Sequence, residues 1–139
     1  MSLRRKLVHL GVAFLLKILD FGLNHFNYSR VTWVLLHLSP TPDPERQEHK
    51  RAYFMGKLVN SVGYHPRVNV SCLRRTLALW WLLRWNGIPS TVQIGVNAKA
   101  GHAWLEHHGM VVNDHPDVLT KYPGRFADEL TPEKAAKLI

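Results

Sequence analysis

Residues 71–87, SCLRRTLALWWLLRWNG, predict a helix that runs through the centre of the fold. Apolar side chains occupy nearly every side of the segment from Cys72 to Trp85, which is typical of a core helix rather than a surface helix. Ser71 is a good N-cap residue, and Asn86-Gly87 supplies a left-handed stop. We therefore expect this helix to be buried, with its three tryptophans packed in the core.

Short strands are predicted after this helix. Apolar and polar or small residues alternate in TVQIGV (residues 91–96), and the apolar segments HAWLEH (102–107) and MVVND (110–114) follow, separated by His108-Gly109. Because helices precede the strands along the chain, the order predicts an α+β domain. In this domain a small antiparallel sheet packs against the central helix.

Two further helices are predicted within residues 3–38, and the prolines of SPTPDPER (residues 39–46) then stop helix formation. Each proline removes a backbone donor and biases the preceding residue toward extended structure. We place a boundary here, between an N-terminal helical extension (residues 1–44) and a core (residues 45–139). Within the core, residues 45–61 predict another helix, and Thr131-Pro132 predicts a short one near the end of the chain.

Length, charge and cysteine content restrict the class of protein. A chain of 139 residues fits one domain with a substantial core. The single cysteine excludes an intramolecular disulfide and a four-cysteine zinc site, so we expect a reducing cytoplasm. The net charge of +8 suggests an anionic partner. The arginines at positions 74, 75 and 84 lie in an apolar helix rather than among stacking aromatics, so we expect no nucleic-acid binding.

The N-terminal segment MSLRRKLVHLGVAFLLKILDFGL begins like a secretory signal, with basic residues before an apolar run. However, Lys17 and Asp20 follow the run, and no small-residue cleavage site appears. The run from Leu7 to Leu16 is also shorter than the roughly 20 apolar residues that a membrane span needs. We expect no membrane span but an amphipathic helix that packs on the core or a partner, with docking on a membrane surface as the alternative.

Cys72 is the candidate nucleophile. It lies in the first turn of the central helix, where unpaired N–H groups carry a partial positive charge that lowers the pKa of a thiol. A histidine within reach would complete the activation, and His102, at the start of the second strand, is the candidate. The alternative for a lone cysteine is a small buried hydrophobic residue.

A third catalytic member is suggested by counting across the predicted hairpin. Pairing centred on His108 places Asp114 opposite His102, with β-carbons about 5 Å apart, where a carboxylate can orient the imidazole. A shift of the turn by one residue would bring Asn113 or His115 opposite His102 instead. Asn113 is an alternative orienter, because an amide can also hold an imidazole.

A metal site is not expected, although HAWLEHH invites the hypothesis of zinc with Cys72 as a further ligand. His102 and Glu106 share one face of a strand while His107 points to the other, so these side chains do not converge. Glu106 also lies roughly 13 Å from His102 along the strand, too far to orient it.

The segments SCLRRTLALWWLLRWNGIPSTVQIGV and GHAWLEHHGMVVND, in this order and spacing, resemble the transglutaminase-like cysteine proteases, specifically the leader peptidases of lasso-peptide biosynthesis. The resemblance covers roughly residues 55–115. It implies a papain-like fold that needs no cofactor. It further implies that Cys72 attacks a peptide carbonyl, that His102 acts as base and then acid, and that Asp114 orients His102.

Two donors are needed for the oxyanion of such a reaction. One can be the backbone N–H of Cys72. The second is sought upstream, where related folds place a side-chain donor, and the candidates are Asn60, His65 and Asn69.

The resemblance also implies a substrate and partners. The substrate is a ribosomally made precursor peptide, cut between leader and core before a separate ATP-dependent lasso cyclase closes the ring. Fused members of the family carry a leader-recognition domain, for which the 44 residues before the core are too few, so we expect a separate small leader-recognition protein. The alternatives are another transglutaminase-fold amidase or acyltransferase and a non-catalytic basic binding module. The intact Cys, His and Asp argue against the binding module.

Overall fold

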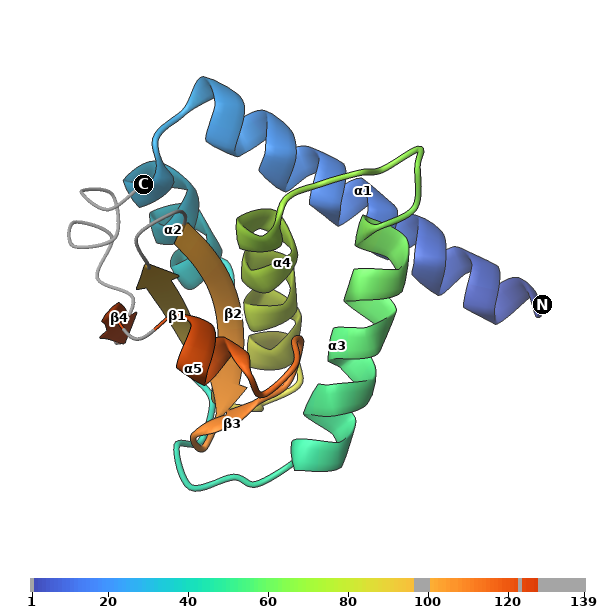
Figure 1. The fold of residues 1–139 in the computed structure, drawn as a ribbon. Helices are drawn as coiled ribbons and strands as arrows, with labels where there is room; N and C mark the ends of the chain where they lie inside the picture. Colours follow the sequence, from blue (N-terminus) through green and yellow to red (C-terminus); the bar gives the residue numbers. More distant parts are fainter. Residues whose placement is uncertain (1, 97–100, 123, 128–139) are drawn as a thin grey trace.

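The computed structural model describes residues 2–96, 101–122 and 124–127 (Figure 1). The elements follow one another as α1 (Leu3–His25), α2 (Tyr28–His37), α3 (His49–Gly63), α4 (Cys72–Trp85), β1 (Thr91–Val96), β2 (Gly101–His107), β3 (Met110–Val111), α5 (Val118–Lys121) and β4 (Gly124–Ala127). The helix predicted at Thr131-Pro132 lies outside the described residues. The structure confirms the α+β class, because α4 packs on a small antiparallel sheet.

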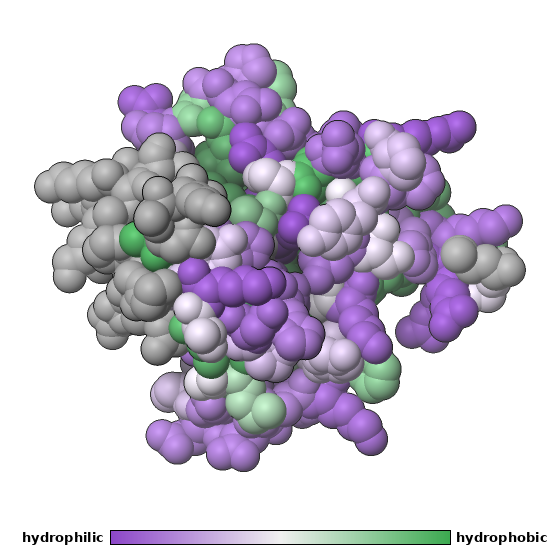
Figure 2. Space-filling view, viewed as in Figure 1, coloured by the Kyte–Doolittle hydropathy of each residue, from purple (hydrophilic) through white to green (hydrophobic). Residues whose placement is uncertain are grey.

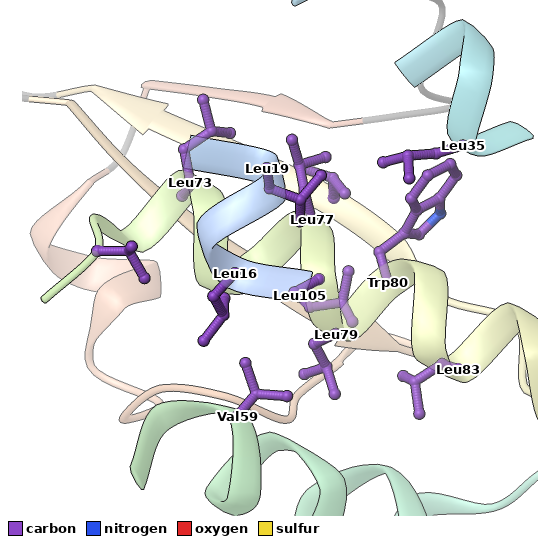
Figure 3. Packing of buried hydrophobic residues seen from close by; sticks show 14 of the residues in the cluster. Leu16, Leu19, Leu35, Val59, Leu73, Leu77, Leu79, Trp80, Leu83 and Leu105 are labelled. Carbon is purple, nitrogen blue, oxygen red and sulfur yellow. The ribbon is translucent and has the colours of Figure 1, made fainter. Parts of the chain in front are cut away.

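The central helix α4 has the predicted bounds and lies between α3 and the sheet, with α1 crossing one end (Figure 1). Figure 3 shows side chains from α1, α2, α3 and β2 gathered around it, among them Leu16, Leu35, Val59 and Leu105. This surrounding explains why α4 is apolar on nearly every side. Trp80 and Trp81 pack in or against the core as expected, but Trp85 is exposed.

The C-terminus of α4 is closed as the sequence predicts. Gly87 adopts φ +71°. Its N–H donates to the Arg84 carbonyl (3.0 Å), and the Ile88 N–H donates to the Leu83 carbonyl (2.9 Å). These paired bonds form a Schellman motif, which turns the chain toward β1.

The sheet has the order β3-β2-β1-β4, with all neighbours antiparallel. In the β1–β2 pair, Gly95 lies opposite His102 and Gln93 opposite Trp104. Strand β4, which the sequence did not predict, adds to the other side of β1. The hydroxyl of Thr76 donates to the Ala103 carbonyl (3.3 Å), so the start of β2 lies next to the first turns of α4.

The predicted pairing of the β2–β3 hairpin about His108 is wrong by one residue. His107 pairs with Met110, and the turn is formed by His108 and Gly109, with φ of +47° and +79°. Two consecutive residues with positive φ match the twist of a tight hairpin, and glycine readily adopts the second. In addition, β3 ends at Val111 instead of continuing to Asp114.

Helix α3 begins at His49, four residues later than predicted, because the segment before it bonds to the hairpin instead of to a helix. The N–H of Glu48 donates to Nε2 of His107 (2.9 Å), and Nε2 of His108 bonds the Arg46 carbonyl (2.8 Å). Arg46 in turn donates to the carbonyl of Asn86 at the end of α4 (2.9 Å). This segment thus joins α4 and the hairpin.

The two N-terminal helices are present as predicted, with a break at Phe26-Asn27. Helix α1 contributes Val12, Leu16 and Leu19 to the core, while the division of the chain at residue 44 stays a prediction. By length and composition α1 could cross a membrane, and it is the one described helix that passes this test. The face of the molecule in Figure 2 is mostly hydrophilic.

Candidate active site

Cys72 lies half-buried in the first turn of α4. Ser71 occupies the N-cap position with extended backbone, but its hydroxyl makes no capping bond. Instead it accepts a hydrogen bond from Nη1 of Arg74 (2.9 Å). The N–H groups of the first turn are therefore not masked by a side-chain cap, and the positive end of the helix dipole acts on Cys72.

His102 is held at the start of β2 by two aromatic rings. The Tyr122 ring stacks on the imidazole with ring centroids 5.2 Å apart. The centroid of the Trp104 ring lies 6.1 Å from that of the imidazole. Gly95, opposite His102 on β1, leaves room for both rings. A β-carbon at this position would lie 2.5 Å from the β-carbon of Tyr122 and 2.6 Å from the Trp104 ring. The pairing of β1 with β2 thus fixes the setting of the imidazole.

Asp114 binds the imidazole with one carboxylate oxygen. Oδ2 is hydrogen-bonded to Nε2 of His102, and Oδ1 accepts the backbone N–H of His115 (2.7 Å). Because Nε2 is taken by Asp114, Nδ1 is the ring nitrogen left for the hydrogen bond that His102 forms with Cys72. The structure therefore brings together the three side chains that the sequence singled out.

Asn113, the alternative orienter, does not hold His102. Its Oδ1 accepts the N–H of Leu105 (2.8 Å), and its Nδ2 donates to Oγ1 of Thr76 (3.1 Å). Its carbonyl accepts from Nδ2 of Asn60 (2.7 Å). Asn113 thus ties the segment that carries Asp114 to β2, α4 and α3 at once, which is a positioning role.

The protonation states of Cys72 and His102 follow from their contacts. Burial would raise the pKa of the Cys72 thiol, but the hydrogen bonds from His102 and the Ala103 backbone, with the charges of His102 and Arg75, outweigh it and lower that pKa. The hydrogen bonds with Asp114 and Cys72 raise the pKa of His102 to about 9, against the opposing effect of burial. At pH values above the lowered pKa of Cys72 and below the raised pKa of His102, the site holds a thiolate beside an imidazolium.

The pKa of Asp114 is lowered. Burial acts against its charged form, but the bonds from His102 and the His115 N–H and the charges of His102 and Arg75 prevail. Asp114 therefore stays a carboxylate at neutral pH, and its charge favours the imidazolium.

Arg75 is a member of the site that sequence reasoning missed. This side chain is 8% exposed, and its guanidinium donates to the Val70 carbonyl (2.6 Å) and the Tyr64 hydroxyl (3.0 Å) while lying over the Tyr64 ring at 4.1 Å. Its positive charge lowers the pKa of Cys72 and Asp114. The available signal was its position three residues after Cys72, which places both on the same face of the helix.

The three candidates for the second oxyanion donor lie in different settings. The amide of Asn60 already donates to Asn113. His65 is exposed, and its Nδ1 accepts the Arg67 N–H (3.2 Å). Asn69 is exposed and has a φ of +46°. The second donor stays a prediction.

Among residues 2–96, 101–122 and 124–127, no group of three or more His, Cys, Asp or Glu side chains is arranged to hold a metal ion. His49, His107 and His108 do lie together, with ring centroids 4.5–6.0 Å apart. Each bonds backbone through a ring nitrogen, to the His107 carbonyl, the Glu48 N–H and the Arg46 carbonyl, respectively. These three histidines therefore form a structural contact between the β2–β3 hairpin and the segment at the start of α3.

Comparison with known proteins gives a family match, and its range includes the candidate site. Residues 15–124 match the family model described as the Transglutaminase-like superfamily, and this range contains Cys72, His102 and Asp114. No curated protein and no solved structure gives a significant match to the chain.

Proposed function

The chain belongs to the transglutaminase-like superfamily, and from this premise we propose that it is a cysteine peptidase that removes the leader from a ribosomally made lasso-peptide precursor. One observation carries the proposal. The Cys72 thiol lies at the N-terminus of α4, its interaction with His102 lowers its pKa, and Nε2 of His102 is hydrogen-bonded to Asp114. This arrangement supplies a nucleophile, a proton carrier and an orienting carboxylate.

In the first step the Cys72 thiolate attacks the carbonyl carbon of the scissile peptide bond. The carbonyl π electrons move to oxygen, and the backbone N–H of Cys72 stabilises this oxyanion at the positive end of α4. When the tetrahedral intermediate collapses, the C–N bond breaks and His102 gives its proton to the leaving amine. The products are a free amino terminus and an acyl thioester on Cys72.

In the second step water hydrolyses the thioester. His102, now neutral, takes a proton from the water as its oxygen attacks the thioester carbonyl, and the C–S bond then breaks. The leader leaves with a new carboxyl terminus, and Cys72 and His102 return to the thiolate–imidazolium pair. Asp114 keeps the imidazole oriented in both steps.

The substrate class rests on the resemblance of the two catalytic segments to lasso-peptide leader peptidases. We assign leader recognition to a separate small protein, and ring closure to an ATP-dependent lasso cyclase that acts on the released core. The free thiol of Cys72 fits a reducing compartment, and we place the reaction in the cytoplasm.

The experiment is mass spectrometry of a lasso-peptide precursor after incubation with this protein, with and without a leader-recognition protein. The variant Cys72→Ala is the blank. The expected result is one cut at the leader–core junction that requires Cys72 and is faster with the partner. An intact precursor in the presence of the partner, together with rapid alkylation of Cys72, would favour the alternative of an amidase or acyltransferase on the same fold.

A further inference from the structure

The outward face of α1 is an apolar stripe. Six side chains recur at intervals of three or four residues and therefore lie along one side of the helix. Each is at least half exposed, and they are Leu3, Leu7, Leu10, Phe14, Ile18 and Phe21. At a rise of 1.5 Å per residue the stripe is about 27 Å long. We call it the α1 stripe.

The opposite face of α1 fixes the helix to the protein. Val12, Leu16 and Leu19 are buried in the core, and at 3.6 residues per turn they lie roughly opposite the α1 stripe. Asp20 accepts from Nε of Arg74 on α4 (2.6 Å). Crossing a bilayer would require α1 to leave the core and this ion pair. The stripe is thus presented outward by a helix that is held in place, with its first turns extending past α3 (Figure 1).

Positive charge borders the α1 stripe. Arg4, Arg5 and Lys6 lie in its first turns, and Lys17 lies beside its second half. On a helical wheel Lys6 and Lys17 flank one margin of the stripe and Arg4 flanks the other. The single acidic residue of α1 is Asp20, which is already paired with Arg74. The whole chain carries a net charge of +8, so the protein that carries the α1 stripe also attracts an anionic partner.

We propose that α1 docks this protein in the plane of an anionic membrane surface, with the α1 stripe among the acyl chains and the basic side chains at the headgroups. An apolar face bordered by Lys and Arg is the pattern of helices that lie in a membrane interface. The six side chains contain no hydrogen-bonding group, whereas protein interfaces pair such groups across the contact. The basic margins match anionic headgroups in charge.

The first test uses the single native cysteine. In a Cys72→Ala background, Phe14→Cys carries an environment-sensitive fluorophore, and Phe54→Cys on α3 is the matched control, because Phe54 is also an exposed phenylalanine (59% against 69% for Phe14) but lies outside the stripe. With vesicles of phosphatidylcholine and phosphatidylglycerol, the label at residue 14 is expected to shift to the blue and brighten, while that at residue 54 is unchanged. Equal responses at both sites, or none at residue 14, would overturn the proposal.

The second test distinguishes a membrane surface from a protein as the binding partner of the α1 stripe. The affinity of the full chain for vesicles is measured by co-sedimentation. It is expected to fall at least about tenfold in Phe14→Gln/Ile18→Gln, but not in Tyr53→Gln/Phe54→Gln. All four positions are exposed, so the thermal unfolding of both variants should match the parent chain. A wild-type dimer that becomes monomeric in Phe14→Gln/Ile18→Gln and binds no vesicles would assign the stripe to a second copy. Loss of binding to a leader-recognition protein, without vesicle binding by the parent chain, would assign it to that protein.

The depth of the two ends of α1 in the bilayer distinguishes a helix that lies in the membrane plane from one that spans the membrane. Fluorophores at Leu3→Cys and Phe21→Cys, in the Cys72→Ala background, lie at opposite ends of the stripe. For a helix in the plane, a reductant that cannot cross the bilayer is expected to quench both labels at similar rates when added outside the vesicles. Protection of the label at residue 3 with quenching at residue 21 would mean a spanning helix and would overturn the proposal.

Discussion

Asp114 reaches Nε2 of His102 from outside the β-ladder. Continued pairing of β2 with β3 would set His115 opposite His102, but the ladder breaks after Val111. Val112 still donates its N–H to the Leu105 carbonyl (3.0 Å), whereas the N–H of Leu105 is taken by the Asn113 side chain (2.8 Å). The amide of Asn113 thus replaces a backbone acceptor, and the chain turns so that the next residue meets the imidazole.

The state of Cys72 can be tested by its rate of alkylation with iodoacetamide as a function of pH. The lowered pKa of Cys72 means that the thiolate persists at pH values where an ordinary thiol is protonated. In His102→Ala the largest stabilising contact is lost and burial then raises the pKa, so alkylation at pH 6 should fall by at least about tenfold. An unchanged profile in His102→Ala would mean that the imidazole does not activate the thiol.

Asp114 and Asn113 should differ in how they affect cleavage. Asp114→Ala removes the contact that raises the pKa of His102, so activity should fall roughly ten- to a hundredfold and the upper limb of the pH profile should move to lower pH. Asn113→Ala releases the segment that carries Asp114, so it should lower kcat without removing the carboxylate. Loss of activity in Asn113→Ala with full activity in Asp114→Ala would contradict this assignment.

Arg75 should tune the thiol through its charge. Arg75→Met keeps a long side chain beside Tyr64 but removes the cation, so the pKa of Cys72 should rise by less than in His102→Ala. The lost bonds to Val70 and Tyr64 should also cost about 1–3 kcal/mol of stability. Arg74→Met is the matched control, because this neighbour pairs with Asp20. A shift of the alkylation profile in Arg74→Met as large as in Arg75→Met would refute a specific role for Arg75.

Local signals were sufficient to predict most of the fold. The periodicity and end signals of α4 predicted its bounds, because a largely apolar helix closed by Asn86-Gly87 has few alternative structures. Strand β4 was missed because four residues, GRFA, carry too little alternation to indicate a strand. The start of α3 was misplaced because the backbone of Arg46 and Glu48 bonds to distant histidines, a tertiary contact that no local pattern reveals.

The candidate site was predicted in part through an incorrect register. Counting about His108 gave Asp114 as the partner of His102, and the carboxylate does bind the imidazole, but it comes from a segment outside the ladder. The break depends on the amide of Asn113 and its contacts with α3 and α4, which are distant in sequence. Arg75 was not predicted as a site residue because its burial against Tyr64 is a tertiary contact that the surrounding sequence does not reveal.

His107 should make the fold sensitive to acid. Its fully buried ring bonds the Pro89 carbonyl and the Glu48 N–H, and burial lowers its pKa, as do nearby His108 and His49. Because the unfolded chain binds this proton more readily than the folded chain, stability should fall as pH drops below about 6.5. Thermal unfolding from pH 7 to pH 5 should show a smaller decline in His107→Gln than in the parent chain. Equal declines would mean that His107 is not the acid-sensitive group.

Gly95 should be required for the setting of His102. A β-carbon at this position would lie 2.5 Å from the Tyr122 β-carbon and 2.6 Å from the Trp104 ring, so Gly95→Ala must displace one of the two rings that flank the imidazole. We expect a loss of about 1–3 kcal/mol in urea unfolding, because overpacking forces neighbours to shift. Alkylation of Cys72 should slow as well, since His102 loses its fixed orientation. Gly101→Ala is the matched control, because its nearest neighbour would lie 3.7 Å away. If the two variants unfold at the same urea concentration and alkylate at the same rate, the aromatic packing around His102 does not set the catalytic geometry.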